Sequence, residues 1–210
     1  MHDHKQRDDH RPISLHRAHR LNDERRLVDQ VSEHDLARLL ALRGDEDVAD
    51  LGSGTGFYTD RIAALTTGTV YAVDLQPEMN DAYRERGVPG NVRLVLGDIT
   101  GLSLEPESVD VACTIATWHE TGGKVDLPGL VRTLRPRGRL VVIDWRRDPE
   151  SWESGPPADL RFSKEEVAQS LAPFFAAIAA ENLGRFMFAV VGARGRSGAG
   201  TKTRAPGGAG

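Results

Sequence analysis

Residues 47–56 read Asp47-Val48-Ala49-Asp50-Leu51-Gly52-Ser53-Gly54-Thr55-Gly56, an apolar run that passes directly into a glycine-rich turn. The run predicts a short buried strand, and the glycines allow the backbone to adopt positive φ angles and to approach a ligand closely. A helix is expected after the turn. Such a turn lies at the carboxyl end of a sheet strand, where open α/β folds bind ligands.

The rest of the chain alternates short β-branched runs with longer amphipathic segments, which is typical of a parallel sheet covered by helices. We therefore predict the α/β class, with strands at 47–51, 69–73, 92–96, 109–115 and 139–144. An apolar stripe predicts one helix that begins at Asn22 or Asp23 and ends near Leu42; the stripe comprises Leu27, Val31, Leu36, Leu39 and Leu40.

The last third of the sequence predicts a loop, a helix and a hairpin. Residues 146–162 are polar and contain Gly155-Pro156-Pro157, so we expect a loop that covers an acceptor site. Ser163 and Glu166 have the spacing of a capping box, which starts a helix. The apolar runs 174–182 and 186–193 predict an antiparallel hairpin that closes the sheet.

Length and composition favour one domain. The 210 residues, 39% of them hydrophobic, suffice for a single core, which we place at 21–193. The His-rich residues 1–20 and the Gly- and Arg-rich residues 194–210 have few apolar side chains, so both are expected to be disordered. No apolar run approaches the roughly 18 residues of a membrane span, and we expect a cytoplasmic protein.

Charge and cysteine content disfavour several kinds of site. The formal net charge is −4, although 194–210 carries only basic charges, so the remainder is more acidic still. An acidic body disfavours nucleic acid as a partner. The single cysteine, Cys113, lies in an apolar run and cannot form a disulfide or a cysteine-based metal site within one chain, and no metal is expected.

The glycine spacing separates two classes of cofactor. A dinucleotide-binding loop requires G-x-G-x-x-G, but Phe57 stands where the third glycine after Gly52 and Gly54 should be. Asp50, immediately before the loop, is suited to pair with the amino group of a bound amino acid. These features favour an amino-acid-bearing cofactor over NAD.

At this point the sequence resembles the class I S-adenosylmethionine-dependent methyltransferases, whose first motif is an acidic residue followed by alternating glycines. The resemblance extends from about Arg25 to Ala193. It implies a Rossmann-like fold with a mostly parallel seven-stranded sheet, a C-terminal antiparallel hairpin and helices on both faces. It also implies that S-adenosylmethionine is the cofactor and that its methionine part lies at the glycine loop, formed by Gly52, Ser53, Gly54, Thr55 and Gly56.

The same resemblance assigns residues to the ribose and the adenine of the cofactor. Asp74, after the second strand, would bind the ribose hydroxyls, because a carboxylate can accept hydrogen bonds from both hydroxyls of a diol. Neighbouring Leu75 and Met79 would border the ribose and adenine, although Met79 is equally suited to the core. The expected adenine segment follows the third strand and consists of Gly97-Asp98-Ile99. Thr114 lies where the fourth strand approaches the donor methyl.

Methyl transfer is an in-line displacement, so positioning supplies much of the catalysis and a base is needed only if the acceptor must lose a proton. His119, after the fourth strand, is the candidate base. Local helix capping is its alternative role. The candidate acceptor-side residues are Tyr58, Trp118, Glu120, Asp144 and Trp145.

The acceptor is expected to be a small organic molecule. The Asn-Pro-Pro-Tyr-like signature of amino-directed nucleic-acid methyltransferases is absent at 113–118, and Cys113 alone cannot hold arsenic as arsenite methyltransferases do. Carbon methylation of a quinone-type compound and protein methylation both stay open. Two alternatives to a methyltransferase are an NAD-dependent oxidoreductase and a non-catalytic, S-adenosylmethionine-binding regulatory protein.

Overall fold

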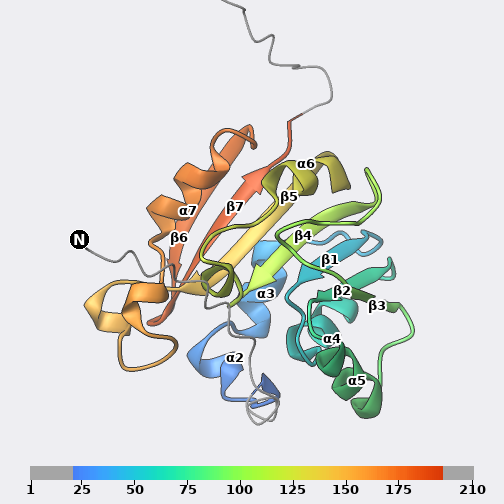
Figure 1. Cartoon of the computed structure of the whole chain (residues 1–210), viewed down its shortest axis with the longest axis horizontal. Helices are drawn as coiled ribbons and strands as arrows, with labels where there is room; N and C mark the ends of the chain where they lie inside the picture. Colours follow the sequence, from blue (N-terminus) through green and yellow to red (C-terminus); the bar gives the residue numbers. More distant parts are fainter. Residues whose placement is uncertain (1–20, 196–210) are drawn as a thin grey trace, which may run out of the picture.

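Seven strands form one sheet in the order β3-β2-β1-β4-β5-β7-β6 in the computed structural model, which describes residues 21–195 (Figure 1). The strands are β1 (Val48–Leu51), β2 (Val70–Asp74), β3 (Val92–Leu96), β4 (Val109–Ile115), β5 (Leu134–Trp145), β6 (Ala177–Leu183) and β7 (Met187–Ala193). The α-helices are α2 (Arg26–Asp29), α3 (Glu33–Leu40), α4 (Phe57–Ala63), α5 (Pro77–Arg86), α6 (Leu127–Thr133) and α7 (Lys164–Leu171).

The sheet has the predicted topology. Strands β1 to β5 pair in parallel, whereas β7 runs antiparallel to both β5 and β6. The C-terminal hairpin is therefore confirmed, and only β7 is reversed in direction. Because β1 and β4 are neighbours, their carboxyl ends lie side by side at the point where the strand order reverses.

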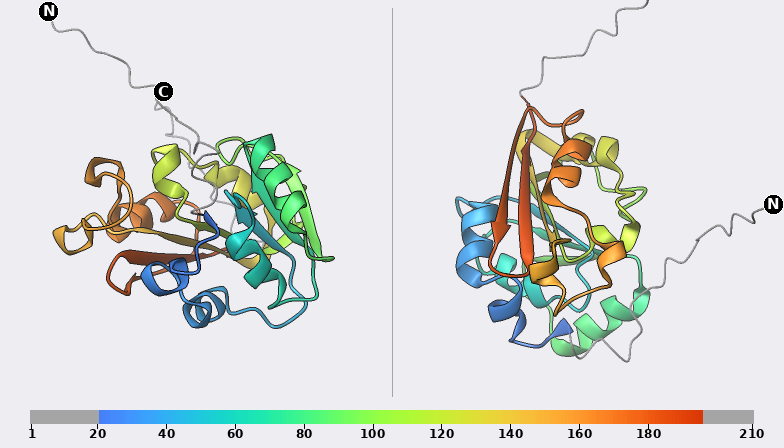
Figure 2. Two further views of the ribbon diagram at one scale, coloured as in Figure 1. Left: turned by 90° about the horizontal axis from the view of Figure 1, so that it is seen from below. Right: turned by 90° about the vertical axis from the view of Figure 1, so that its left-hand side faces the viewer.

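Helices cover both faces of the sheet, as Figure 2 shows in its right-hand view. On one face, α3 and α4 pack Leu36, Leu40 and Ile62 against the sheet. On the other face, Leu130 of α6 and Val167 of α7 occupy the equivalent position. The two cores hold the carboxyl ends of the central strands at one edge of the molecule.

The helix predicted from Asn22 or Asp23 to about Leu42 is wrong. Two short helices, α2 and α3, take its place. Ser32 has an extended backbone, and its side chain accepts a hydrogen bond from the Asp35 amide, so it caps α3 and ends the helical path from α2. The apolar stripe continues across this break because Val31 is fully buried between the helices.

Two further local predictions have different outcomes. The capping box of Ser163 and Glu166 is present at the start of α7. Strand β5, expected to begin at residue 139, instead begins at Leu134. The loop 146–162 contains two short 3-10 turns, η3 (Pro149–Ser151) and η4 (Ala158–Leu160).

Two expectations concern the ends of the chain. The His-rich arm 1–20, and all of the basic tail beyond residue 195, lie outside the described residues. Within residues 21–195, no helix combines the length and the apolar character that crossing a membrane requires.

Candidate active site

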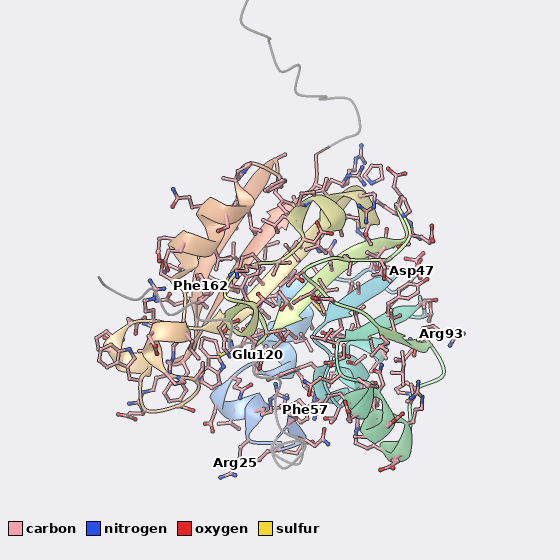
Figure 3. The ribbon with its side chains drawn as sticks, viewed as in Figure 1. Arg25, Asp47, Phe57, Arg93, Glu120 and Phe162 are labelled. Atoms are coloured by element: carbon pink, nitrogen blue, oxygen red, sulfur yellow. The ribbon has the colours of Figure 1, made fainter. Side chains whose placement is uncertain are left out.

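A cavity of about 860 Å³ opens at the carboxyl ends of β1, β2, β4 and β5, and a smaller one of about 220 Å³ adjoins it. In Figure 3, Glu120 and Phe57 lie toward this edge of the sheet, and Asp47 lies at the opposite edge. The two cavities share five lining residues and therefore form one continuous site; these are Gly52, Asp74, Gln76, Thr117 and Glu120.

The glycine loop adopts a backbone that only glycine tolerates easily. Gly52, Gly54 and Gly56 have φ angles of 79°, 54° and 85°. A Cβ atom on Gly52 would overlap the Thr117 side chain, and one on Gly56 would overlap the Tyr83 ring. Gly52, Ser53, Gly54 and Thr55 line the cavity, whereas Gly56 caps α4 and lines neither cavity.

Asp74 ties the loop to the end of β2. Its Oδ2 accepts a hydrogen bond from the Gly54 amide at 2.8 Å, and its Oδ1 accepts one from the Gln76 amide at 2.9 Å. Each carboxylate oxygen can accept a further bond. Burial raises the pKa of Asp74, and the carboxylate lines both cavities.

Asp50 lies at the floor of the larger cavity. The Thr59 hydroxyl donates a 2.6 Å hydrogen bond to it, and the Cys113 thiol lies 3.8 Å from its other oxygen. Burial raises the pKa of Asp50 to about 6. Cys113 is fully buried, as expected for a packing role.

The remaining cofactor candidates divide between the cavities. Leu75, Gly97, Asp98 and Ile99 line the smaller one, and Met79 lines the larger one. Thr114 lines neither cavity: it is buried within β4, and its hydroxyl has no hydrogen-bond partner among the described residues.

A His–Asp pair borders the larger cavity. His119, in the 3-10 turn η2 (Trp118–Thr121), places Nδ1 2.8 Å from Oδ1 of Asp144 on β5. Oδ2 of Asp144 accepts the His119 backbone amide at 3.0 Å, which fixes the position of the turn. Nδ1 is thus occupied, and Nε2 is the ring nitrogen left for a ligand.

The charges around this pair alter its protonation. Burial alone lowers the pKa of His119, but the hydrogen bond and negative charge of Asp144 outweigh burial, so the pKa is raised. Burial also raises the pKa of Glu120, to about 7. Glu120 lines both cavities, and the charges of Asp144 and Asp74 also raise its pKa, whereas that of His119 lowers it.

The other acceptor-side candidates have different positions. Tyr58 and Trp145 line the larger cavity. Trp118 is 1% exposed, belongs to the core between the sheet and α7, and lines neither cavity. Asp144 lines neither cavity, but its carboxylate contacts Nδ1 of His119, which lines the larger one.

Arg26 also borders the cavity, although the sequence did not predict it. Its guanidinium lies 4.9 Å from the Phe57 ring centre and 4.6 Å from that of Tyr58, and it lines the larger cavity. Its hydrogen bonds among the described residues go to neutral oxygens, those of the Leu21 carbonyl and the Gln30 side chain. An arginine in a short surface helix carries no motif that would have identified it.

The donor groups present suit S-adenosylmethionine. Asp74 retains acceptor capacity for a diol, and Gly52 presents backbone without a side chain to the cavity. Asp50 offers a carboxylate to an ammonium group, and Arg26 offers a guanidinium to a carboxylate. Both charges of an amino acid therefore have partners in one cavity.

Comparisons with known proteins agree with this reading. A family model described as a methyltransferase domain matches residues 48–138. The chain is 35% identical over 106 residues to an uncharacterized methyltransferase-like protein of Schizosaccharomyces pombe, a match that covers 50% of this chain and 41% of that protein. It is 30% identical over 116 residues to a ubiquinone/menaquinone biosynthesis C-methyltransferase of Ectopseudomonas mendocina, covering 52% and 45%.

A solved structure matches more of the chain. The crystal structure of a SAM-dependent methyltransferase from Aquifex aeolicus is 25% identical, with a TM-score of 0.75, and the match covers 87% of this chain and all of that one. The chain spans less than half the length of the curated relatives named above. Together with the fold and the cavity, these matches support a class I S-adenosylmethionine-dependent methyltransferase and imply S-adenosylmethionine as the cofactor.

Proposed function

We propose that this protein transfers the methyl group of S-adenosylmethionine, by in-line displacement, to a small organic acceptor. The observation that carries the proposal is that a single cavity joins the glycine loop and Asp74 to the His119–Asp144 pair. Donor-binding groups and a proton acceptor therefore border the same space, as a group transfer requires.

The donor end would be bound by residues of β1, β2 and the loop after β3. Asp50 pairs with the ammonium group, Arg26 with the carboxylate and Asp74 with the ribose hydroxyls. Ile99 packs against adenine, and Asp98 accepts a bond from its amino group. S-adenosylmethionine supplies a methyl group attached to a positively charged sulfur, which makes that methyl electrophilic.

The acceptor end would be served by His119. Its Nε2 accepts the proton of an acceptor hydroxyl or amine, and Asp144 stabilises the resulting imidazolium through Nδ1. Asp144 also holds the ring in the tautomer that leaves Nε2 unprotonated before the reaction. Ile115 and Trp145 give part of the same space an apolar surface.

The relatives leave the acceptor class open. The Ectopseudomonas protein is named for carbon methylation in quinone biosynthesis, so a quinone-type acceptor deserves inclusion among the compounds tested. The non-catalytic alternative predicts cofactor binding without turnover. The NAD-dependent alternative lacks its third glycine, because Phe57 begins α4 at that position.

Calorimetry followed by a labelling experiment tests the proposal. S-adenosylmethionine and S-adenosylhomocysteine should bind saturably, and NAD should not. Protein incubated with labelled methyl donor and a metabolite extract should then yield a methylated small molecule, identified by mass, that is lost in Asp74→Ala. Saturable binding of NAD alone would overturn the proposal, and donor binding without any product would favour the regulatory alternative.

A further inference from the structure

Arg161 carries a buried positive charge in the segment 146–162, which connects β5 to α7 (Figure 1). The residue is 2% exposed. Among the described residues, none of its hydrogen-bond partners is a carboxylate. The guanidinium donates to uncharged oxygens, which are those of the Arg146, Ser151, Ser154 and Pro156 carbonyls and of the Ser151 hydroxyl. These hydrogen bonds hold the guanidinium in place without neutralising its charge.

The guanidinium of Arg161 stays charged at this buried position. Burial lowers its pKa, and the negative charges of Asp144 and Asp148 oppose that effect. The ordinary pKa of arginine lies so far above neutral pH that the group remains protonated. Arg161 is therefore a fixed positive charge over the whole pH range in which a histidine titrates.

This charge lies beside the end of β5, next to Asp144. Asp144 is 1% exposed, and its Oδ1 accepts a hydrogen bond from the Trp145 amide at 2.6 Å. Arg161 contacts the two residues that follow Asp144: its guanidinium lies 5.7 Å from the Trp145 ring centre, and Nη1 donates to the Arg146 carbonyl at 3.0 Å. Two opposite buried charges therefore lie close together without a hydrogen bond between them.

Asp148 is the other acid that acts on Arg161, but its charge already has a partner. Its Oδ2 lies 2.7 Å from Nε of Arg146, and its side chain is 40% exposed. Asp144 differs, because among the described residues its carboxylate accepts hydrogen bonds from main-chain amides and from the His119 ring alone. Arg161 is the permanent positive charge beside Asp144, whereas His119 becomes charged only by binding a proton.

The balance of these charges sets the protonation of His119. Burial lowers the pKa of His119, the hydrogen bond and charge of Asp144 raise it, the charge of Glu120 raises it further, and the charge of Arg161 lowers it. These charged groups act on the ring from β5, from its own turn η2 and from the segment 146–162. Without Arg161, the buried Asp144 carboxylate would lose its permanent counter-charge, and a proton bound by His119 would replace it.

We propose that Arg161 is a positioning residue that supplies the counter-charge of Asp144 and so keeps the His119 imidazole in the neutral form that a general base requires. The role of His119 as a base rests on the proposed function; the charge interaction does not. Arg161 lines neither cavity, so it acts through Asp144 and the ring, without touching a ligand. A protonated imidazole has no lone pair with which to accept a proton, so the loss of Arg161 would disable the base.

NMR titration of the histidine ring protons in the cofactor-free protein tests the proposal without turnover. The His119 signal is the one lost in His119→Ala, and the signal of His34, exposed on α3, is the internal reference. Arg161→Gln removes the charge but keeps an amide donor, and it should raise the pKa of His119 by about half a unit or more, about threefold in proton affinity. Arg161→Lys keeps the charge and should stay within about 0.2 unit of the native protein.

Two results would overturn the proposal. One is an unchanged pKa of His119 in Arg161→Gln, and the other is an equal rise in Arg161→Lys, because the hydrogen bonds and not the charge would then be responsible. Arg185→Gln is the matched control. Arg185 pairs with Glu153 of the same segment at 2.8 Å, but both side chains are exposed, so removal of this charge should leave the pKa of His119 unchanged.

Asp144→Asn keeps the proposal falsifiable if Arg161→Gln does not fold. It leaves the charge of Arg161 unopposed, so the pKa of His119 should fall below its ordinary value of 6.5. A value above 6.5 would contradict the proposal.

The proposed function fails separately from this inference. If the pKa of His119 responds to Arg161 as expected but His119→Ala still transfers labelled methyl groups at the native rate, the base is misassigned and the charge interaction stands. If His119→Ala abolishes transfer and Arg161→Gln leaves the pKa unchanged, the proposed function stands and the role of Arg161 is wrong.

Discussion

The proposed donor end and the proposed acceptor end of the cavity are built in different ways. The donor end consists of three short stretches, 50–56, 74–79 and 97–99, each at the end of a parallel strand. The acceptor end brings His119 of η2 to Asp144 of β5 and adds the segment 146–162. The donor end repeats one local arrangement, in which the residues at the end of a parallel strand line the cavity. The acceptor end depends on tertiary packing between separate elements.

This difference has a physical origin. A cofactor of fixed shape needs the same groups at the same strand ends, and parallel β-strands bring those ends to one edge automatically. An acceptor differs from one enzyme to another, so its walls come from loops that the scaffold merely supports. Substitutions at the donor end should therefore change cofactor affinity, and substitutions at the acceptor end should change turnover.

The largest expected effect is on turnover at the acceptor end. His119→Ala should lower kcat by about 10²–10⁴, because the proton acceptor is lost, with S-adenosylmethionine affinity within about twofold. Labelled-methyl transfer and calorimetry measure the two quantities. His34→Ala, exposed on α3, is the control and should leave both unchanged. A parallel fall in donor affinity for His119→Ala would contradict the division into two ends.

The next effect is on donor binding. Gly52→Ala should weaken S-adenosylmethionine binding by about 100-fold or more, because the new Cβ would overlap Thr117 at a φ of 79°. Gly184→Ala isolates backbone strain, since Gly184 has a φ of 57° and open space around it. That control should cost only about 1 kcal/mol of unfolding free energy and leave donor affinity unchanged.

A smaller effect is expected from pH. The pKa of Asp50 is raised to about 6, and pairing with an ammonium group requires its ionised form, so donor binding releases a proton. Affinity should fall by up to about tenfold from pH 6 to pH 5. Calorimetry on Asp50→Asn should give a flatter profile; parallel profiles would show that another group is responsible.

The same raised pKa sets the sign of the pH effect on stability. In the cofactor-free protein, protonated Asp50 is favoured by folding. Its contribution to the free energy of unfolding is therefore fully present below the ordinary value of 3.8 and is lost as the pH rises through about 6. Denaturant unfolding of native protein and Asp50→Asn at several pH values measures this contribution.

The smallest effect is expected at Thr114. Thr114→Val should leave donor affinity within about twofold and change the free energy of unfolding by no more than about 1 kcal/mol, toward greater stability, because the buried hydroxyl has no partner among the described residues. Thr59→Val is the contrasting variant, since its hydroxyl bonds to Asp50, and it should be destabilising. A large loss of donor affinity in Thr114→Val would restore Thr114 to the donor site.

Much of the fold could be predicted from sequence. β3 and β4 have the predicted bounds, and the hairpin and the capping box at Ser163 are present. The helix at the N-terminal side was mispredicted because an apolar stripe continued past a cap: Ser32 interrupts the helix while Val31 maintains the buried face. Periodicity records which residues are buried, and it does not record where the backbone turns.

The candidate site was predicted unevenly for the same reason. Asp50, Asp74 and Asp98 could be identified because each lies at or just after the carboxyl end of a strand, and all three line the site. Thr114 belongs to β4 and is buried away from the cavity, since alternate residues of a strand face opposite sides of the sheet. Trp118, in the turn η2 after β4, packs in the core. Strand position alone did not determine which residues face the ligand.

The sequence by itself determined the class of fold and the positions of the glycine loop and of the strand-end carboxylates that line the cavity, because these depend on local backbone conformation and on strand order. Only the tertiary structure decided that His119 contacts Asp144, that Arg26 reaches the cavity and that Arg161 binds the carbonyls of its own segment. Those contacts join residues from separate elements or reach into a segment without regular structure. Their energies depend on burial and distance, which no spacing in the sequence encodes.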